Sequence, residues 1–468
     1  MSDARNLLPA ETYATSNEEG GRKWVYPRRA QGRFLKWRRI VAVGLITLYS
    51  ALPHIRIAGK PAIFLDIPAR RFTFFGQTFW PTDTLLLAFF GIGLVLTVVA
   101  VTAIFGRVWC GWACPQTVYM EFVYRPIERL LEGQGAAQEK FNASPSSSAK
   151  LLRKILKWTL FLIISFLLAN TFLAYFVGTD KLWTWMVGSP SDHLFGFAVV
   201  LFITALMMFD FTWFREQMCT IACPYGRLQS VMTDNRTIQV GYDAKRGEPR
   251  GKIQRGELKK DEVKHGDCLD CKMCIQTCPT GIDIRNGLQL ECIGCTQCID
   301  ACDTVMTRVG KPNGLIRYAS AEALSGKKTT ILKPRLFAYA TIILVAIGGF
   351  LFNLSGHSEA EFSVLRAIDS PFQVLPDGRI SNSLKFRVAN HAAEQREYTI
   401  TLIEPENGQL FVPSTLKVPG GTIGTVAALV MLPSDEVVGG RRQLTFVVND
   451  KYNTELTQHF WFLGPNSR

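Results

Sequence analysis

The sequence predicts an integral membrane protein that carries a cysteine-rich soluble insert and a small C-terminal β-domain. Three observations lead to this fold class. Five long apolar runs interrupt the chain, all twelve cysteines lie between Cys110 and Cys302, and short stretches of alternating apolar residues follow Leu354. A membrane bundle with one metal-binding or redox insert and a separate β-domain accounts for all three.

The apolar runs are the predicted membrane helices. Each is rich in Leu, Phe, Val and Ile and approaches the roughly 20 residues with which a helix crosses a bilayer. The first run follows basic residues, as the apolar part of a signal peptide does, but no clear cleavage site of small residues comes after it. We therefore expect five spans, over residues 40–55, 84–106, 158–179, 194–213 and 336–354.

Lys and Arg residues predict which side of the membrane each loop faces. Eight basic residues lie within residues 22–39 and eight more between the second and third spans, whereas the loop between the third and fourth spans holds only Lys181. Basic residues in the first outer loop weaken this pattern. We expect the N-terminus and the insert to be cytoplasmic, with the C-terminus on the outer side. Contact with inner-membrane lipids then explains the net charge of +13 better than nucleic-acid binding does.

Two cysteine quartets are the strongest motif in the insert. Both have the C-x2-C-x2-C-x3-C spacing of bacterial ferredoxins, in which three thiolates of one run hold a 4Fe-4S cube and the fourth reaches the other cube. Pro279 follows the first quartet as the motif requires, whereas Asp303 follows the second. Because the proline is no ligand, we expect two clusters. The first is held by Cys268, Cys271, Cys274 and Cys302, and the second by Cys292, Cys295, Cys298 and Cys278.

The same cysteines have one alternative interpretation. Zinc also binds Cys-x-x-Cys pairs. A zinc site needs neither the third cysteine at this spacing nor the trailing proline, so a ferredoxin-like domain over about residues 260–310 is the preferred interpretation.

A second cysteine motif occurs twice, at the ends of the second and fourth predicted spans. It consists of Cys110 and Cys114 before Pro115, and of Cys219 and Cys223 before Pro224. Cysteines four residues apart lie on one face of a helix, and we expect each proline to end or bend its helix just past the second sulfur. Two such pairs can form one four-thiolate site at the cytoplasmic edge of the membrane.

The chemistry of that four-thiolate site points to copper. Soft thiolate ligands favour Cu(I), so the site would draw bound Cu(II) toward reduction. Electrons that arrive one at a time from a neighbouring cluster match the single-electron step from Cu(II) to Cu(I). Three other interpretations stay open: packing of the cysteines as small apolar side chains, a third iron-sulfur cluster, or a dithiol that faces a quinone.

Three further ionisable residues have no assigned role. Asp210 lies near the end of the fourth span, where an ionisable group is often functional, but solvation at the boundary explains it equally well. His54 and His193 lie near the outer boundary, and no spacing pairs them as ligands. The sequence identifies neither the electron donor nor the oligomeric state.

The C-terminal part has the pattern of short strands. Apolar and polar residues alternate over residues 384–388 and 398–402, and Pro, Asp and Gly mark turns between such runs. Roughly a hundred residues of this kind predict an immunoglobulin-like β-sandwich. The predicted domains are a basic N-terminal segment (1–36), four membrane helices (37–214), the insert (215–335), a fifth helix (336–354) and the β-domain (355–468).

These features together resemble one family, the cytochrome oxidase accessory proteins called CcoG, FixG or RdxA. The resemblance covers nearly the whole chain: five spans, both cysteine motifs, the β-domain, the run Trp-Cys-Gly-Trp-Ala-Cys-Pro-Gln at residues 109–116 and the run Gly-Leu-Ile-Arg-Tyr at residues 314–318. The Trp-Cys-Gly-Trp-x-Cys-Pro element also occurs in membrane ferredoxins of the NapH and NosR types. The β-domain after a fifth span favours the first family.

The resemblance implies a multi-pass protein of the bacterial inner membrane, with its ferredoxin domain cytoplasmic and its β-domain periplasmic. It implies a cupric reductase that supplies Cu(I) for assembly of the cbb-type cytochrome c oxidase. The partners would be oxidase subunits or assembly factors and a periplasmic copper chaperone. The alternative is a quinol dehydrogenase-type membrane ferredoxin that passes electrons to a partner reductase without handling copper.

Overall fold

The computed structural model describes most of the chain. The described residues are Thr15 and residues 22–57, 59–79, 84–251, 265–328, 333–355, 360–367, 370–392, 394–452 and 455–465. The chain divides into two compact units, a larger one within residues 1–349 and a smaller one formed mainly by residues 350–468. Much of the predicted N-terminal segment, and residues 252–264 of the insert, lie outside the described residues.

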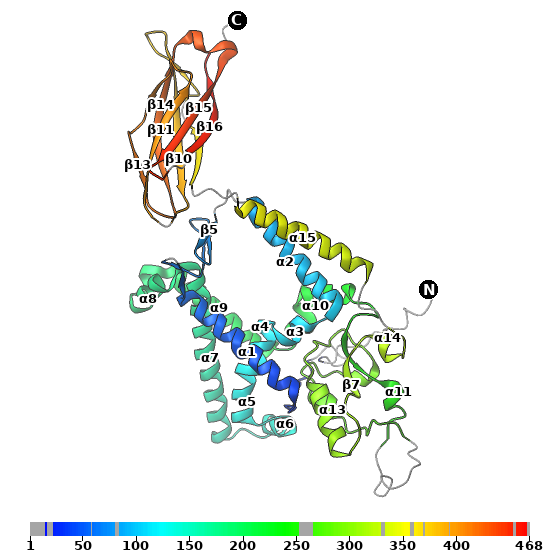
Figure 1. Ribbon diagram of the computed structural model, residues 1–468. Coiled ribbons are helices and arrows are strands. Elements are labelled where there is room, and N and C mark those ends of the chain that lie inside the picture. The colour runs from blue at the N-terminus through cyan, green and yellow to red at the C-terminus, as the bar shows by residue number, and fades with distance from the viewer. Residues whose placement is uncertain are drawn as a thin grey trace. The chain divides into compact units, whose positions relative to one another are not determined.

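Four helices of the described residues are long and apolar enough to cross a membrane. They are α2 (Thr84–Phe105), α7 (Ser148–Val177), α9 (Leu194–Phe209) with its continuation η5 (Asp210–Phe214), and α15 (Pro334–Ser355). The first predicted span forms α1 (Arg33–Ala51; Figure 1), which is not among the four. Lys36, Arg38 and Arg39 occupy its first two turns, so its apolar part is shorter than a bilayer needs. The fifth span stays a prediction.

Small and apolar side chains pack the membrane helices together. Ala169 and Leu173 on α7 are buried against Val200 on α9. Helix α15 lies beside α2, where a Cβ added at Gly349 would meet the ring of Phe89 at 2.8 Å (Figure 1). The close contacts between these helices therefore depend on small residues, as is common in membrane bundles.

Short helices surround the points where the chain leaves the membrane helices. They are α3 (Val108–Trp112), α4 (Pro115–Tyr119), η3 (Met120–Tyr124), α5 (Arg125–Glu132), α6 (Ala136–Ala143), α8 (Thr179–Val187), η6 (Met218–Ala222) and α10 (Pro224–Met232). Tyr124 is fully buried, and its ring stacks on Phe211 with the centroids 4.1 Å apart. This stack joins η3 to η5.

A two-stranded sheet closes the insert. Its elements are β6 (Gln239–Tyr242), α12 (Met273–Gln276), α13 (Gln297–Arg308) and β7 (Ile316–Ala319). Strands β6 and β7 pair antiparallel, which brings the two ends of the cysteine-rich segment together. Val240, Ile299 and Leu315 are buried between them and the cysteines. The quartets therefore lie within one small domain.

The insert also caps α1. The Asp300 carboxylate on α13 accepts hydrogen bonds from the backbone nitrogens of Phe34 (3.2 Å) and Leu35 (2.8 Å). A carboxylate is a favourable partner for the N–H groups at the start of a helix. Helix α1 is thereby tied to the insert.

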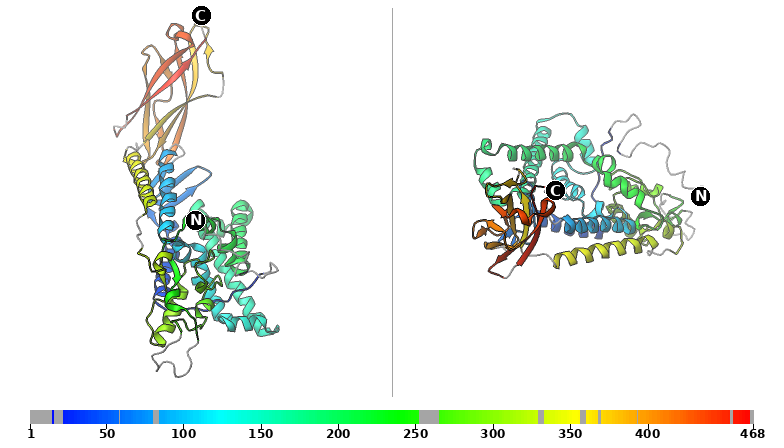
Figure 2. Two further views of the ribbon diagram at one scale, coloured as in Figure 1. Left: turned by 90° about the vertical axis from the view of Figure 1, so that its right-hand side faces the viewer. Right: turned by 90° about the horizontal axis from the view of Figure 1, so that it is seen from above.

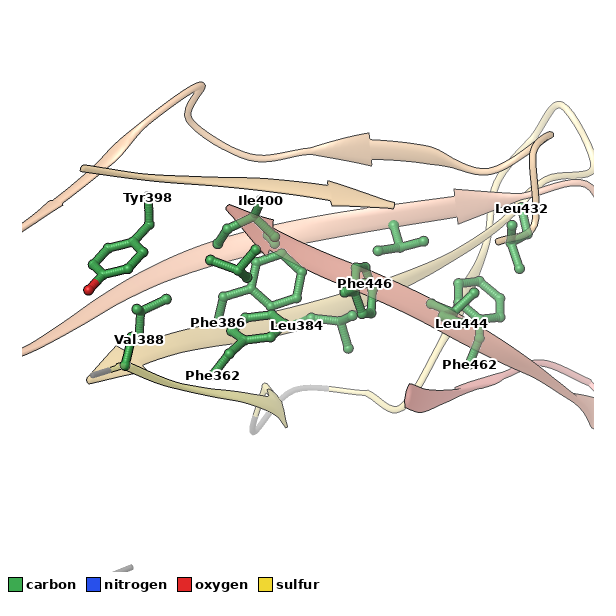
Figure 3. Close-up of a cluster of buried hydrophobic side chains, with 14 of the residues drawn as sticks. Phe362, Leu384, Phe386, Val388, Tyr398, Ile400, Leu432, Leu444, Phe446 and Phe462 are labelled. Atoms are coloured by element: carbon green, nitrogen blue, oxygen red, sulfur yellow. The ribbon is translucent and has the colours of Figure 1, made fainter. Parts of the chain in front are cut away.

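Two antiparallel sheets form the C-terminal unit (Figure 2). One has the order β12-β14-β10-β8, with β9 beside β10, and the other has the order β13-β11-β15-β16. The strands are β8 (Ala360–Arg366), β9 (Gln373–Val374), β10 (Ile380–Asn390), β11 (Arg396–Glu404), β12 (Gln409–Phe411), β13 (Leu416–Val418), β14 (Thr422–Leu432), β15 (Arg441–Asp450) and β16 (Glu455–Leu463). Phe386 and Phe446 come from different sheets and meet edge to face, 5.0 Å apart, in the core (Figure 3). The predicted strands at residues 384–388 and 398–402 are confirmed.

Candidate metal centre

Two cavities inside the insert bring the cysteines of both quartets together. The first cavity is lined by Cys268, Cys271, Cys274 and Cys302. The second is lined by Cys278, Cys292, Cys295 and Cys298, together with Cys274. Each cavity therefore takes the last cysteine of the other quartet, which is the crossed arrangement of two-cluster ferredoxins.

The backbone turns in the same way around both quartets. Asp270 and Lys272 have φ of 49° and 56°, and Gly294 and Thr296, at the equivalent positions, have φ of 68° and 61°. Such angles are uncommon for residues other than glycine. They turn successive N–H groups to one side of the chain, which creates the anion-binding concavity found at many iron-sulfur sites. The repeated turns fit one 4Fe-4S cluster in each cavity.

The crossed lining of the two cavities favours iron-sulfur clusters over zinc. Tetrahedral zinc needs four sulfurs at about 2.3 Å from one centre. A cube instead offers a separate iron to each of four separated thiolates. Iron-sulfur clusters therefore suit the insert better, and the assignment of each ligand stays a prediction.

Burial raises the pKa of five insert thiols, namely Cys274, Cys292, Cys295, Cys298 and Cys302. The pKa of Cys302 rises to about 12, and that of Cys298 lies well above its usual range, with burial as the largest cause and neighbouring thiols adding to it. Without a cationic centre these thiols keep their protons. Binding of iron must therefore displace protons from the insert.

The two membrane-edge motifs differ from the helical pairs that the sequence predicts. Cys110 lies in α3, but Cys114 has extended backbone and is the residue before α4. Cys219 lies in η6, and Cys223 likewise precedes α10. The expectation that both sulfurs lie on one helix, which the proline then ends, is wrong. Each proline instead begins the next helix, because its fixed φ and missing N–H suit the first helical turn.

The repeat extends further back than the cysteines. Gly106 (φ 56°) follows α2 and Arg215 (φ 53°) follows η5, each four residues before the first cysteine of its motif. Glycine adopts this backbone freely. Arg215 is held there by a bidentate pair, since its Nη1 and Nη2 donate to the two carboxylate oxygens of buried Glu128 at 2.8 and 2.9 Å. The chain therefore leaves both spans through the same kind of turn.

Two of the membrane-edge thiols, Cys110 and Cys219, lie close enough to the other members of the set for those thiols to raise their pKa. Burial raises the pKa of Cys110 to about 12, with Cys114 and Cys223 adding to the shift and Arg107 opposing it. Burial also raises the pKa of Cys219, and the other three thiols add to that shift. The structure thus brings both pairs to one location. Across the described residues, no three Cys, His, Asp or Glu side chains gather closely enough to ligate one ion.

The membrane-edge thiols lie against the second cavity of the insert. Cys110, Ile293 and Cys295 form one buried cluster, and Cys219 and Tyr225 pack against it. A sulfur of the membrane-edge site therefore neighbours a predicted cluster ligand.

Two glycines allow the backbones of these parts to touch. A Cβ at Gly111 would lie 2.5 Å from the carbonyl oxygen of Gly294, a distance that real Cβ atoms do not show. Arg38 Nε donates to the carbonyl oxygen of Gly111 at 2.9 Å, and Trp112 Nε1 donates to the Tyr318 hydroxyl at 3.0 Å. These hydrogen bonds tie the first membrane-edge motif to α1 and β7, and the Tyr318 hydroxyl in turn donates to the carbonyl oxygen of Gly294 at 3.3 Å.

The three residues without an assigned role lie in different surroundings. Asp210 accepts a hydrogen bond from Gln116 Nε2 at 3.1 Å and is near enough to Cys219 to raise the pKa of that thiol. His193 is exposed and stacks on Trp185, and His54 is exposed. Only Asp210 thus lies near the thiols.

Sequence reasoning missed a set of buried charges beside the thiols. Glu121, Arg125, Glu128 and Glu132 are each less than 5% exposed. Burial raises the pKa of Glu121, but three neighbouring arginines outweigh that effect and hold it at about 2. The spacing of these residues places them on one helix face, and this pattern was visible in the sequence.

A membrane bundle with two four-thiol cavities beside it defines a membrane-bound 4Fe-4S electron-transfer protein. Family models agree with this class. A 4Fe-4S dicluster domain matches residues 214–321, and a 4Fe-4S binding domain matches residues 87–133, which include Cys110 and Cys114. The IG-like fold at the C-terminal of FixG matches residues 350–465.

The chain belongs to the FixG/RdxA family. It is 32% identical to the nitrogen fixation protein FixG of Rhizobium meliloti, over 84% of this chain and 83% of that protein. It is 34% identical to RdxB of Cereibacter sphaeroides over 91% and 90% of the two chains, and 35% identical to RdxA of the same organism over 81% and 82%. The expected family is confirmed, and the protein is an iron-sulfur oxidoreductase.

Proposed function

We propose that this protein reduces Cu(II) to Cu(I) at Cys110, Cys114, Cys219 and Cys223, with electrons from clusters in the insert. One observation carries the proposal: Cys110, Ile293 and Cys295 belong to a single buried cluster. An electron that leaves the second cavity therefore passes to the membrane-edge thiols without crossing solvent.

The residues of this chain have distinct tasks in the proposed reaction. Clusters bound at the eight insert cysteines supply electrons singly. Gly111 and Gly294 keep the membrane-edge motif in contact with the loop of the second quartet. The four membrane-edge thiolates hold the substrate copper and favour its Cu(I) state, so each electron converts one Cu(II) to Cu(I). Arg107 lies near Cys110 and favours the ionised thiol.

The proposed location is the bacterial inner membrane, with the insert in the cytoplasm and the β-domain in the periplasm. The distribution of Lys and Arg and the family membership support this orientation. The β-domain would bind a periplasmic copper chaperone or a subunit of an assembling cbb-type oxidase. Alkaline phosphatase fused after residue 355 should be active in cells, and activity of a fusion after residue 328 would contradict the orientation.

The copper reaction is tested with anaerobically purified full-length protein. Its clusters are reduced with dithionite, excess reductant is removed, and Cu(II) is added with a chromogenic Cu(I) chelator. We expect Cu(I) to form at least tenfold more slowly when the four membrane-edge cysteines are replaced by serine, while the iron content is unchanged. A Met218→Leu variant controls for changes within η6. Equal rates in the wild type and the four-serine variant would end the proposal.

A second candidate is electron transfer without copper, with a third 4Fe-4S cluster on the membrane-edge thiols. The match of residues 87–133 to a 4Fe-4S binding domain favours it. Iron analysis separates the two candidates, because two clusters give about eight irons per chain and three give about twelve. Loss of four irons in the four-serine variant would establish the second candidate.

A further inference from the structure

A cavity of about 570 Å³ lies at one end of the membrane helices, apart from both cluster cavities. Its walls come from the N-terminal segment, α5, α6, α7, α9 and η5. This volume is typical of sites that bind small organic ligands. No residue of the cavity belongs to the cysteine motifs.

The wall of this cavity is aromatic where it meets the membrane helices. Trp158 on α7 and Trp213 on η5 face it, and Trp24 and Tyr26 from the N-terminal segment complete that side. Tryptophan near the ends of membrane helices marks the interface between lipid and water. The cavity is therefore placed where the polar end of a lipid-soluble molecule resides.

The charges in the cavity are paired with one another. Glu132 is joined to Lys157 at 2.7 Å and to Lys154 at 3.0 Å, and Glu128 is joined to Arg215 at 2.8 Å. A phosphate group would have to compete with these carboxylates for the cations. A neutral ligand whose oxygens both donate and accept hydrogen bonds matches such pairs better.

One residue of the cavity wall also lies near the thiols. Arg215 lines it and lines a second, smaller cavity that reaches Cys219 and the insert residues Thr280 and Ile293. Only three residues separate Arg215 from Cys219 in the chain. A redox-active ligand bound in the larger cavity therefore shares Arg215 with the smaller cavity, which Cys219 and the insert also line.

We propose that this cavity binds the ring of a membrane quinol, which is the electron donor of the clusters. A quinol has an aromatic ring that packs on tryptophan and a hydroxyl group that bonds to the Glu132 and Lys157 pair. Its oxidation releases two electrons and two protons. Each of two clusters accepts one electron, the protons pass to water, and a quinone leaves. This inference rests on the proposed function, for which it supplies the reductant.

The test adds decylubiquinol to the full-length oxidised protein in detergent without oxygen and follows cluster reduction by electron paramagnetic resonance. We expect Trp213→Leu to slow reduction at least tenfold. Trp183→Leu on α8, also an exposed tryptophan, should react as the wild type does. Dithionite should reduce all three proteins equally. No quinol-dependent reduction of the wild type, or equal rates in Trp213→Leu and the wild type, would overturn the inference.

A second measurement needs no variant. A photoreactive azidoquinone should label wild-type peptides that contain residues 154–158 or 208–213, and excess decylubiquinol should prevent the labelling. Labelling prevented by phosphatidylglycerol vesicles but not by decylubiquinol would assign the cavity to a lipid headgroup and refute the quinol. If dithionite-reduced clusters reduce Cu(II) but quinol does not reduce the clusters, only this inference fails. If quinol reduces the clusters but Cu(II) is not reduced, only the proposed copper function fails.

Discussion

The insert and the membrane edge both gather cysteines, but they do so in different ways. In the insert, turns with positive φ at equivalent positions of both quartets shape two cavities, each lined by four cysteines of a crossed set. At the membrane edge, the thiols lie at helix ends and share one location. None of the cavities described above is lined by all four of them. The first arrangement suits a resident cofactor. The second suits a centre that an ion enters and leaves.

The largest expected effect tests the crossed arrangement in the insert. Replacing Cys302 by serine should remove the cluster of the first cavity, although Cys302 belongs to the second quartet by sequence. Iron should fall from about eight to about four per chain if only that cluster is lost. Iron analysis with electron paramagnetic resonance measures this.

The cluster that remains distinguishes the crossed arrangement from an uncrossed one. Cys295, which shares a buried cluster with Cys110 of the membrane edge, lines the second cavity. The cluster that remains in Cys302→Ser should therefore be the one next to the membrane edge. The crossed arrangement would be contradicted if the Cys302→Ser variant lost the signals of the second cluster and kept those of the first.

A smaller effect tests what holds the membrane edge in place. Glu128→Gln removes the buried partner of Arg215, whose backbone has φ of 53°. Breaking one side of a buried ion pair costs about 3–5 kcal/mol of stability. The midpoint of thermal unfolding in detergent should fall clearly below that of Glu139→Gln, an exposed glutamate on α6. Coincident midpoints would show that the pair does not hold this turn.

The smallest effect tests the link between the two regions. Asp300→Ala removes the hydrogen bonds that cap α1 from the insert. Loss of such a cap costs about 1 kcal/mol. Limited proteolysis should cleave near the start of α1 faster in Asp300→Ala than in Asp300→Asn, since asparagine also caps helices. Equal cleavage in the alanine variant and the wild type would show that the cap is dispensable.

The sequence predicted the insert better than the membrane edge, for a physical reason. Spacing within a quartet is local, so it constrains which thiols share a cavity. The prediction for the motif at Cys114 was wrong because the sequence alone does not show whether a proline begins a helix or ends one. The backbone turn before the cysteines decides this. That turn depends at Arg215 on a partner far away in sequence, Glu128. The contact between Gly111 and Gly294 is likewise a long-range property.

Composition predicted the four apolar helices found in the described residues, and the span at α1 stays a prediction. Lys36 and Arg39 in its first two turns are exposed, whereas Arg38 is buried and donates to Gly111 of the first membrane-edge motif. A hydropathy pattern contains no information about such a partner. The helical spacing of the buried charges from Glu121 to Glu132 was enough to predict that they share one helix face.

The proposed copper reduction depends most on electron transfer across the contact between Gly111 and Gly294. The direct measurement mixes dithionite-reduced protein rapidly with Cu(II) and records the rate at which the clusters are oxidised. Gly111→Ala should slow this at least tenfold with the iron content unchanged, because its Cβ would lie 2.5 Å from the carbonyl oxygen of Gly294. Gly91→Ala in α2, where a Cβ meets nothing within 4 Å, should match the wild type. Equal rates in Gly111→Ala and the wild type would contradict the account.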